Sequence, residues 1–126
     1  MSIFISIASY QDPLLVSTIF SAYNNARNKD ELVFSICDQS DDGIKVEEIG
    51  FVDQIHYEHV NPLFSKGPCW ARHRAQNFFN DEDFFLQIDS HTQFAPNWDV
   101  IFLSLIHISE PTRRTPISYA VFCLKK

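Results

Sequence analysis

The order of apolar and polar residues along the first forty positions predicts a strand, a helix and a second strand. Residues 3–8 and 32–37 are short runs of β-branched and aromatic residues, which is the pattern of buried strands. Between them, apolar residues recur at helical spacing over residues 13–28, and Asp12-Pro13 suits a helix start. A strand, a helix and a strand in this order predict a right-handed βαβ unit with parallel strands.

The same alternation continues in the second half of the chain. Residues 54–60 and 84–88 have strand patterns, residues 68–79 have helical spacing, and a further helix begins near residue 97. Residues 45–52 fit either a short helix or an irregular insertion. Together these elements predict an α/β fold with a mostly parallel, Rossmann-like sheet flanked by helices. In such open sheets, ligands bind beyond the carboxyl ends of the strands.

Composition and charge narrow the class of protein. With 126 residues, of which 45% are hydrophobic and 21% are charged, the chain has the size of one ordinary globular domain. The net charge of −6 argues against a nucleic-acid partner. We find no signal peptide and no apolar run long enough to span a membrane. Three cysteines without metal-like spacing favour reduced thiols and a cytoplasmic protein: Cys37, Cys69 and Cys123.

The end of the chain resembles a translated sequencing adapter. Residues 103–113 and 117–126 match the two constant blocks of a transposase-type library adapter in one frame, and the residues between them cover its variable index. We therefore divide the chain into residues 1–102, the N-terminal part of a natural domain, and residues 103–126, a non-native tail excluded from fold reasoning. The alternative is a natural C-terminal helix and strand.

The candidate chemistry follows the strand predicted at residues 84–88, where Asp89, Ser90 and His91 stand in succession. A strand places residues i and i+2 on one face, so Asp89 and His91 are predicted to aim at one point. A carboxylate oxygen and an imidazole nitrogen suit Mn²⁺ or a similar divalent ion such as Mg²⁺, and two protein ligands leave positions for diphosphate oxygens. The alternative is a polar strand end followed by a surface histidine.

Five blocks stand in order along residues 2–102: Phe-Ile-Ser-Ile-Ala-Ser-Tyr-Gln-Asp-Pro, Ile-Cys-Asp-Gln, Gly-Pro-Cys-Trp-Ala-Arg, Leu-Gln-Ile-Asp-Ser-His and Trp-Asp. This order resembles the glycosyltransferases that include the N-acetylglucosaminyltransferase modifying hydroxyproline in a ubiquitin-ligase adaptor. The resemblance implies a GT-A fold, a Rossmann-like nucleotide-sugar domain, whose D-x-D-type metal motif is here Asp89-Ser90-His91. A similar D-S-H triplet serves the polypeptide N-acetylgalactosaminyltransferases.

The resemblance also implies roles for single residues. Simpler roles stay open: Asp12 as a helix N-cap, Arg72 as a solvated helix residue, Gln39 as a loop residue without a ligand, and Trp98 as either core or acceptor-site wall. The family usually has Arg where this chain has Gln11, so no charged role is carried over there. The residues predicted to bind the nucleotide sugar are Ser9, Tyr10, Asp12, Gln39, Arg72, Asp89 and Ser90, and the predicted metal ligands are Asp89 and His91.

We therefore expect part of a metal-dependent glycosyltransferase. By the resemblance, it transfers N-acetylglucosamine from a UDP-sugar to a hydroxyl group of a protein or glycan. The acceptor-binding half, the catalytic base and any third protein ligand of the metal are expected beyond residue 102. The main alternative is a catalytically inactive nucleotide-sugar-binding or structural fragment. A metal-dependent hydrolase is a third possibility, although the additional carboxylates or histidines of a two-metal site are missing.

Overall fold

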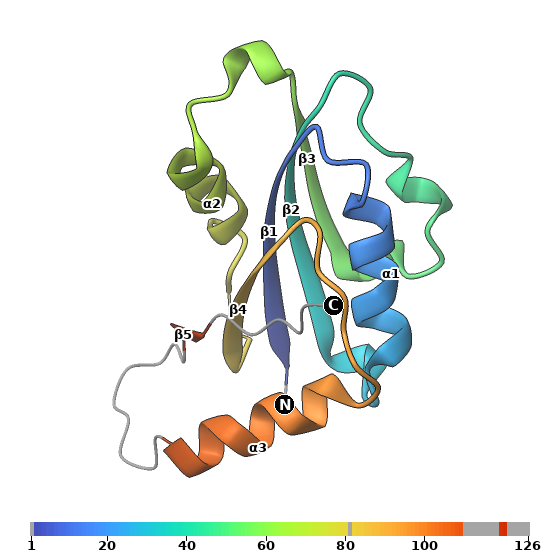
Figure 1. Cartoon of the computed structure of the whole chain (residues 1–126), viewed down its shortest axis with the longest axis vertical. Helices are drawn as coiled ribbons and strands as arrows, with labels where there is room; N and C mark the ends of the chain where they lie inside the picture. Colours follow the sequence, from blue (N-terminus) through green and yellow to red (C-terminus); the bar gives the residue numbers. More distant parts are fainter. Residues whose placement is uncertain (1, 81, 110–118, 121–126) are drawn as a thin grey trace.

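Parallel strands form the sheet of the computed structural model, which describes residues 2–80, 82–109 and 119–120. The strands are β1 (Ile3–Tyr10), β2 (Leu32–Gln39), β3 (Ile55–Val60), β4 (Phe84–Asp89) and β5 (Tyr119–Ala120). Their order in the sheet is β3-β2-β1-β4-β5, which places the first strand in the middle (Figure 1). Every neighbouring pair is parallel. The predicted α/β fold with a Rossmann-like parallel sheet is confirmed.

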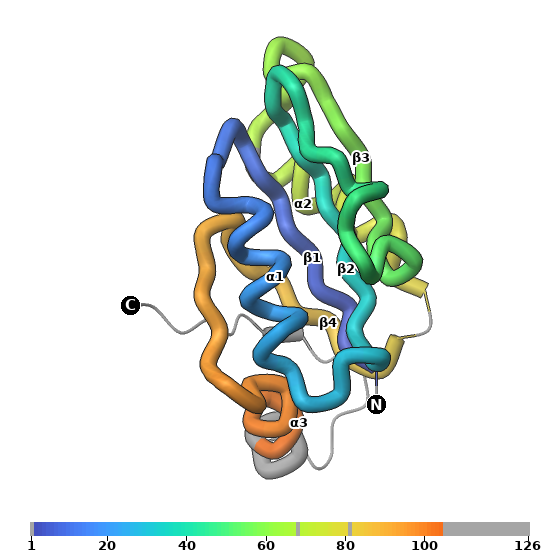
Figure 2. The backbone as a smooth tube through the Cα atoms, turned by 90° about the vertical axis from the view of Figure 1, so that its right-hand side faces the viewer, coloured from blue at the N-terminus to red at the C-terminus, as the bar shows by residue number. Residues whose placement is uncertain are grey.

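Helices cover both faces of the sheet and one of its ends. Helix α1 (Leu15–Asn25) lies on one face and α2 (Pro68–Gln76) on the other, as two views at right angles show (Figures 1 and 2). Helix α3 (Trp98–Ser109) lies near the end where β1 begins, so the carboxyl ends of the strands face away from it. In the described part of the chain, no helix is long and apolar enough to cross a membrane. The described residues also form 3₁₀ turns, which are η1 (Lys29–Glu31), η2 (Val46–Glu48), η3 (Val52–Gln54) and η4 (Pro62–Phe64).

The main hydrophobic core lies between the sheet and α1. Alternation along β1 sends Ile3, Ile5 and Ile7 to this face, and each is no more than 1% exposed. From α1, Leu15 and Ile19 pack against them at helical spacing. Fully burying an Ile or Leu side chain contributes about 1.5–3 kcal/mol, so this layer is a main source of stability. The face toward α2 has a smaller core of Cys37, Ala71 and Ala75.

The first helix is shorter than the predicted span of residues 13–28. The Asp12 carboxylate accepts the backbone N–H of Leu14 at 2.9 Å, and the Asp12 carbonyl accepts that of Leu15 at 3.3 Å, so a turn precedes the helix. Leu14 occupies the N-cap position and makes no side-chain capping bond. At the other end, Ala26 is extended, with φ −77° and ψ 144°. Asp12 therefore caps a turn rather than the helix itself.

Residues 45–52 and Trp98, for which the sequence left two interpretations each, both pack against α1. The segment at residues 45–52 is an irregular insertion with a short 3₁₀ turn, and its Phe51 stacks on Tyr23 with ring centroids 3.7 Å apart. Trp98 is fully buried, and its Nε1 donates to the carbonyl oxygen of Ala22 at 2.8 Å. Trp98 is thus a core residue that joins α3 to α1, and not a wall of an acceptor site.

The predicted boundary at residue 102 falls within α3, which continues to Ser109. Residues 119–120 of the predicted tail pair with β4. The other tail positions, residues 110–118 and 121–126, lie outside the described residues, and Cys123 is among them. The division of the chain at residue 102 therefore stays a prediction.

Candidate functional site

The carboxyl ends of β1, β2 and β4 bring the predicted site residues to one edge of the sheet. In the strand register, Tyr10 is opposite Gln39, and Ala8 is opposite Asp89. The turn after β1 and the loop after β4 continue from the same edge, and α2 begins beside it. The predicted residues that gather here are Ser9, Tyr10, Asp12, Gln39, Arg72, Asp89, Ser90 and His91.

A cavity of about 460 Å³ lies on the α1 side of this edge. One wall is Asp38, which is 2% exposed and whose Oδ2 accepts the hydroxyl of Tyr57 at 2.6 Å. The Tyr57 oxygen in turn accepts the N–H of Ile44 at 2.9 Å. Burial, followed by the bond to Asp38, raises the pKa of Tyr57, so the phenol keeps its proton. The cavity is lined by Gln11, Asp12, Pro13, Leu15, Val16, Asp38, Ser40, Asp41, Asp42, Gly43 and Ile44.

A second cavity, of about 330 Å³, lies on the α2 side and contains more of the predicted donor-binding residues. Gln39 is 3% exposed, and its Nε2 donates to the carbonyl oxygen of Ser9 at 2.8 Å. The Gln39 amide oxygen accepts the hydroxyl of Ser65, which ties the loop before α2 to the sheet. Gln39 thus shapes the wall of this cavity. The lining residues are Ala8, Tyr10, Gln39, Ser65, Gly67 and Arg72.

Two arginines of α2 have different surroundings. Arg74 pairs with Glu58 of β3, with Nε donating at 2.9 Å, and lies over the Trp70 ring at 5.2 Å from its centroid. Arg72 is exposed and lines the second cavity. Among the described residues, its guanidinium makes no hydrogen bond or ion pair that the structure records. Arg72 therefore lines the cavity as a cation that is available to a bound anion.

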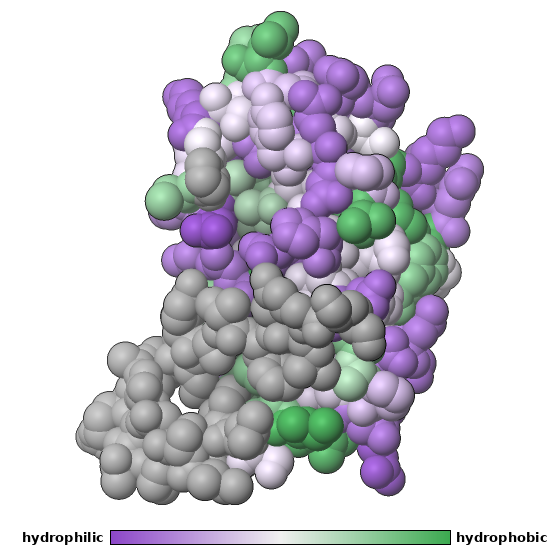
Figure 3. All heavy atoms as spheres, viewed as in Figure 1, coloured by the Kyte–Doolittle hydropathy of each residue, from purple (hydrophilic) through white to green (hydrophobic). Residues whose placement is uncertain are grey.

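The tip of the same edge is apolar. Turn η4 carries Leu63 and Phe64, whose side chains are 89% and 70% exposed, and Asn61 accepts the N–H of Leu63 at 2.9 Å. Figure 3 shows a green, apolar patch at this end of the molecule, above a mostly hydrophilic surface. The turn leads into the loop that supplies Ser65 and Gly67 to the second cavity. The apolar tip therefore adjoins that cavity.

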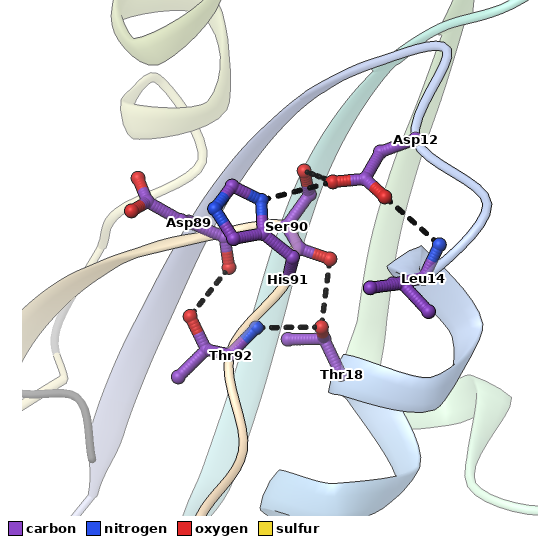
Figure 4. A network of polar contacts seen from close by, with 7 residues as sticks. All are labelled: Asp12, Leu14, Thr18, Asp89, Ser90, His91 and Thr92. Atoms are coloured by element: carbon purple, nitrogen blue, oxygen red, sulfur yellow. Dashed lines mark hydrogen bonds and ion pairs between the residues drawn. The ribbon is translucent and has the colours of Figure 1, made fainter. Parts of the chain in front are cut away.

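The loop after β4 is joined to the turn after β1 through the carboxylate of Asp12 (Figure 4). Asp12 Oδ2 accepts the hydroxyl of Ser90 at 2.6 Å and lies 3.1 Å from Nδ1 of His91. Oδ1 accepts the backbone N–H of Leu14. Both oxygens of a residue predicted to meet the uridine are thus engaged within the protein.

The same contacts control the charge of Asp12. Burial by itself would raise its pKa, but the hydrogen bonds from Ser90, from the N–H of Leu14 and from His91 lower the pKa below its ordinary value. The net effect is a carboxylate that stays ionised at neutral pH. An ionised carboxylate can only accept hydrogen bonds, which fixes the donor role of both side chains that face Oδ2.

Asp89 and His91 do not follow the strand alternation on which their pairing was predicted. Strand β4 ends at Asp89, the chain bends at Ser90, and the His91 ring turns its Nδ1 toward Asp12. In Figure 4 the ring lies between Asp12 and Asp89, with Nε2 on the side away from Asp12. Both Asp89 and His91 are exposed. Within the described residues, no group of three or more His, Cys, Asp or Glu side chains is placed to hold a metal ion.

Comparison with known protein families identifies the chain. A family model described as "Glycosyltransferase (GlcNAc)" matches residues 41–121, about two thirds of the 126 residues. The chain belongs to this glycosyltransferase family. The matched range contains Arg72 and the triplet Asp89-Ser90-His91, and it extends into the predicted tail. No curated protein and no solved structure matches the chain.

The glycosyltransferase holds its Asp-Ser-His loop with a residue that the sequence patterns did not single out. Thr18 of α1 is 1% exposed, and its hydroxyl donates to the carbonyl oxygen of Ser90 at 2.7 Å and accepts the N–H of Thr92 at 3.0 Å. The Thr92 hydroxyl donates back to the carbonyl oxygen of Asp89 at 2.9 Å. A hydroxyl on the buried face of an amphipathic helix needs a partner, and this was the available signal.

Ser65, Asp38 and Tyr57 of the glycosyltransferase were also missed. Ser65 lies in a loop that is 26 residues from its partner Gln39 in the sequence, and Tyr57 is 19 residues from Asp38. Such pairs follow from the sheet register and leave no local pattern in the chain. Ser9 is buried, and its hydroxyl has no hydrogen-bond partner among the described residues.

Proposed function

We propose that this chain forms the donor-binding part of a divalent-metal-dependent glycosyltransferase that transfers N-acetylglucosamine from UDP-N-acetylglucosamine to a hydroxyl group of a protein or glycan. One observation carries the proposal: two exposed side chains, Asp89 and His91, lie at the same edge of the sheet as a cavity lined by Arg72. The chain that carries them belongs to the glycosyltransferase family. No catalytic base is assigned among the described residues, so the proposal concerns the donor side of the reaction.

The chemistry of the two exposed side chains fits Mn²⁺ or Mg²⁺. The structure records no hydrogen bond or ion pair for the Asp89 carboxylate within the described residues, and the Nε2 of His91 is likewise left over after Nδ1 meets Asp12. Carboxylate oxygen and imidazole nitrogen are suitable donors, and two protein ligands leave positions for diphosphate oxygens. When bound, such an ion supplies positive charge against the negative charge that grows on the leaving diphosphate.

The lining of the second cavity supports a role in binding the base and the phosphates of the nucleotide sugar. Its volume of about 330 Å³ lies at the lower end of the range for small-molecule sites. Tyr10 is 57% exposed on its wall, which leaves an aromatic ring free to stack on a base. Arg72 supplies the planar guanidinium that suits a phosphate. The amide nitrogen and the amide oxygen of Gln39 are both hydrogen-bonded within the protein, so Gln39 fixes the cavity wall that carries Tyr10 and Arg72.

The donor and the metal are tested together by titrating the chain with UDP-N-acetylglucosamine, with and without Mn²⁺, in a calorimeter. We expect Mn²⁺ to strengthen binding by the native chain, and Asp89→Ala to remove that gain. Asp53→Ala is the matched control, because Asp53 is an exposed aspartate on the far side of the fold, in turn η3. If Mn²⁺ leaves the affinity for UDP-N-acetylglucosamine unchanged in the native chain, the metal-dependent donor site is refuted.

Turnover is tested separately from binding. Release of UDP from UDP-N-acetylglucosamine, followed with and without hydroxyl acceptors, distinguishes a transferase from a fragment that binds the donor without reaction.

The thiols of Cys37 and Cys69 are free, which supports our proposal that the protein works in the cytoplasm.

A further inference from the structure

One atom pair at the site decides which nitrogen of His91 is available. The carboxylate of Asp12 faces Nδ1 of His91 at 3.1 Å, and a carboxylate can only accept. Nδ1 must therefore carry a proton. In a neutral imidazole with a proton on Nδ1, the lone pair is on Nε2, the nitrogen that Figure 4 shows on the side away from Asp12.

We propose that Asp12 is a positioning residue that holds His91 as the Nδ1–H tautomer and leaves Nε2 to bind the divalent cation, an inference that rests on the proposed metal-dependent function. Histidine ligands commonly donate their second ring N–H to a carboxylate, which fixes both the tautomer and the ring orientation. This role differs from the uridine contact that the sequence resemblance implies for Asp12. It also explains why the ligand pair does not need strand alternation to be held in place.

The Asp12 carboxylate is held in place by groups other than His91, so it can orient the His91 ring. Its side chain is 15% exposed, against 57% for His91. Oδ1 is fixed by the N–H of Leu14, and Oδ2 is fixed by the hydroxyl of Ser90, so the carboxylate has a set orientation without the imidazole. The solvent-exposed ring, by contrast, has Asp12 as the partner that the structure records for it. The orientation of Asp12 is therefore set by Leu14 and Ser90, and the His91 ring is oriented by Asp12.

The isosteric substitution Asp12→Asn tests this role. The amide oxygen can still accept the N–H of Leu14, which turns the NH₂ group toward Ser90 and His91. Nδ1 of His91 then has to accept a hydrogen bond, and the ring proton moves to Nε2, where it blocks metal binding. Asp42→Asn is the matched control, because Asp42 is an exposed aspartate on the neighbouring cavity and loses the same charge.

The first readout is the tautomer of His91 in the metal-free chain. Nitrogen-15 NMR at about pH 8, where an ordinary imidazole is neutral, separates the two tautomers. His91→Gln assigns the signal among the five histidines. We expect Nδ1–H in the native chain and in Asp42→Asn, and Nε2–H in Asp12→Asn. An Nε2–H tautomer in the native chain, or an unchanged tautomer in Asp12→Asn, overturns the proposal.

The second readout is Mn²⁺ binding without any sugar donor. We expect the dissociation constant for Mn²⁺ to rise about 10- to 100-fold in Asp12→Asn, the usual effect of losing such an outer partner, and to change much less in Asp42→Asn. Equal effects of the two substitutions overturn the positioning role, because they reduce it to a loss of charge. If the native chain binds no Mn²⁺, the proposed function fails, while the tautomers still decide whether Asp12 positions His91.

Discussion

Replacing Thr18 by valine tests whether α1 holds the loop that carries the candidate site. The Thr18 hydroxyl bridges two backbone groups of that loop, the carbonyl of Ser90 at 2.7 Å and the N–H of Thr92 at 3.0 Å. Valine has nearly the same shape and a similar helix propensity, so Thr18→Val removes the hydroxyl and little else. The site is 1% exposed at Thr18, so water does not readily replace the lost group.

The size of the effect follows from the two groups left without a partner. A buried donor or acceptor left unsatisfied costs about 1–3 kcal/mol, so we expect Thr18→Val to lower the free energy of unfolding by about 2–4 kcal/mol after partial relaxation. Thr18→Ser is the matched control, because it keeps the hydroxyl and removes one methyl group, worth about 0.8 kcal/mol. A total stability of about 5–15 kcal/mol makes the larger loss easy to detect.

Urea unfolding followed by circular dichroism measures both variants. With a slope of about 1–3 kcal/mol per M, the unfolding midpoint of Thr18→Val is expected to fall by about 1 M or more. The midpoint of Thr18→Ser is expected to fall by only a fraction of that. If the two variants unfold at the same urea concentration, the hydroxyl does not hold the loop, and the reasoning is refuted.

Two further predictions concern the packing around the sheet. Asp99→Ala removes a 1% exposed carboxylate that accepts the N–H groups of Arg27 and Asn28, each at 2.9 Å. Hydrogen bonds to a charged group contribute about 1.5–3 kcal/mol each, so the two bonds together contribute about 3–6 kcal/mol. After partial relaxation we expect urea unfolding to show a loss of about 2–4 kcal/mol, and a loss below about 1 kcal/mol contradicts this. Burial raises the pKa of the Cys37 thiol to about 11, whereas Cys69 is exposed. Since the thiolate is the reactive form, iodoacetamide near pH 8.5 should modify Cys69 and spare Cys37, and equal modification of the folded chain by mass spectrometry contradicts the burial argument.

The sequence predicted the strands well because parallel strands buried on both faces are continuous apolar runs. It placed the ends of β1 and β2 too early, because both strands continue into polar residues. Asp38 and Gln39 stay in the sheet and are buried because Tyr57, Ser9 and Ser65 satisfy their polar groups. A pattern of apolar residues carries no information about such partners, so polar strand ends were read as loop.

Helix ends were also displaced for reasons of tertiary packing. The helix predicted at residues 68–79 ends at Gln76, and Phe79 beyond it packs edge-to-face on Phe4 and Phe85, with ring centroids 5.2 and 5.5 Å away. The apolar residue at helical spacing was thus a partly buried residue in the turn after the helix. Spacing alone does not separate these two cases, because both bury the same side chain on the same face.

In the candidate site, too, the sequence shows the local motif but not the partners that are distant along the chain. The triplet Asp89-Ser90-His91 and its place at a strand end are visible in the sequence. Its partners are not, because Asp12 lies 78 residues before Ser90 and Thr18 lies 72 residues before it. The sequence placed the triplet at a strand end, and the family resemblance assigned Asp12 to the nucleotide; the structure joins Asp12 to Ser90 and His91 of the triplet.

The dependence of the triplet on the first βαβ unit also bears on how the family match is understood. The match begins at residue 41, after β1, α1 and β2 have ended. Yet Asp12 and Thr18 hold the loop after β4, and Gln39 holds the loop before α2. Both predicted halves of the donor site, the ligand pair and the cavity with Arg72, are therefore oriented by residues outside the matched range. Thr18→Val, in α1, should therefore alter donor or metal binding even though Thr18 is buried behind the loop after β4 and lines neither cavity.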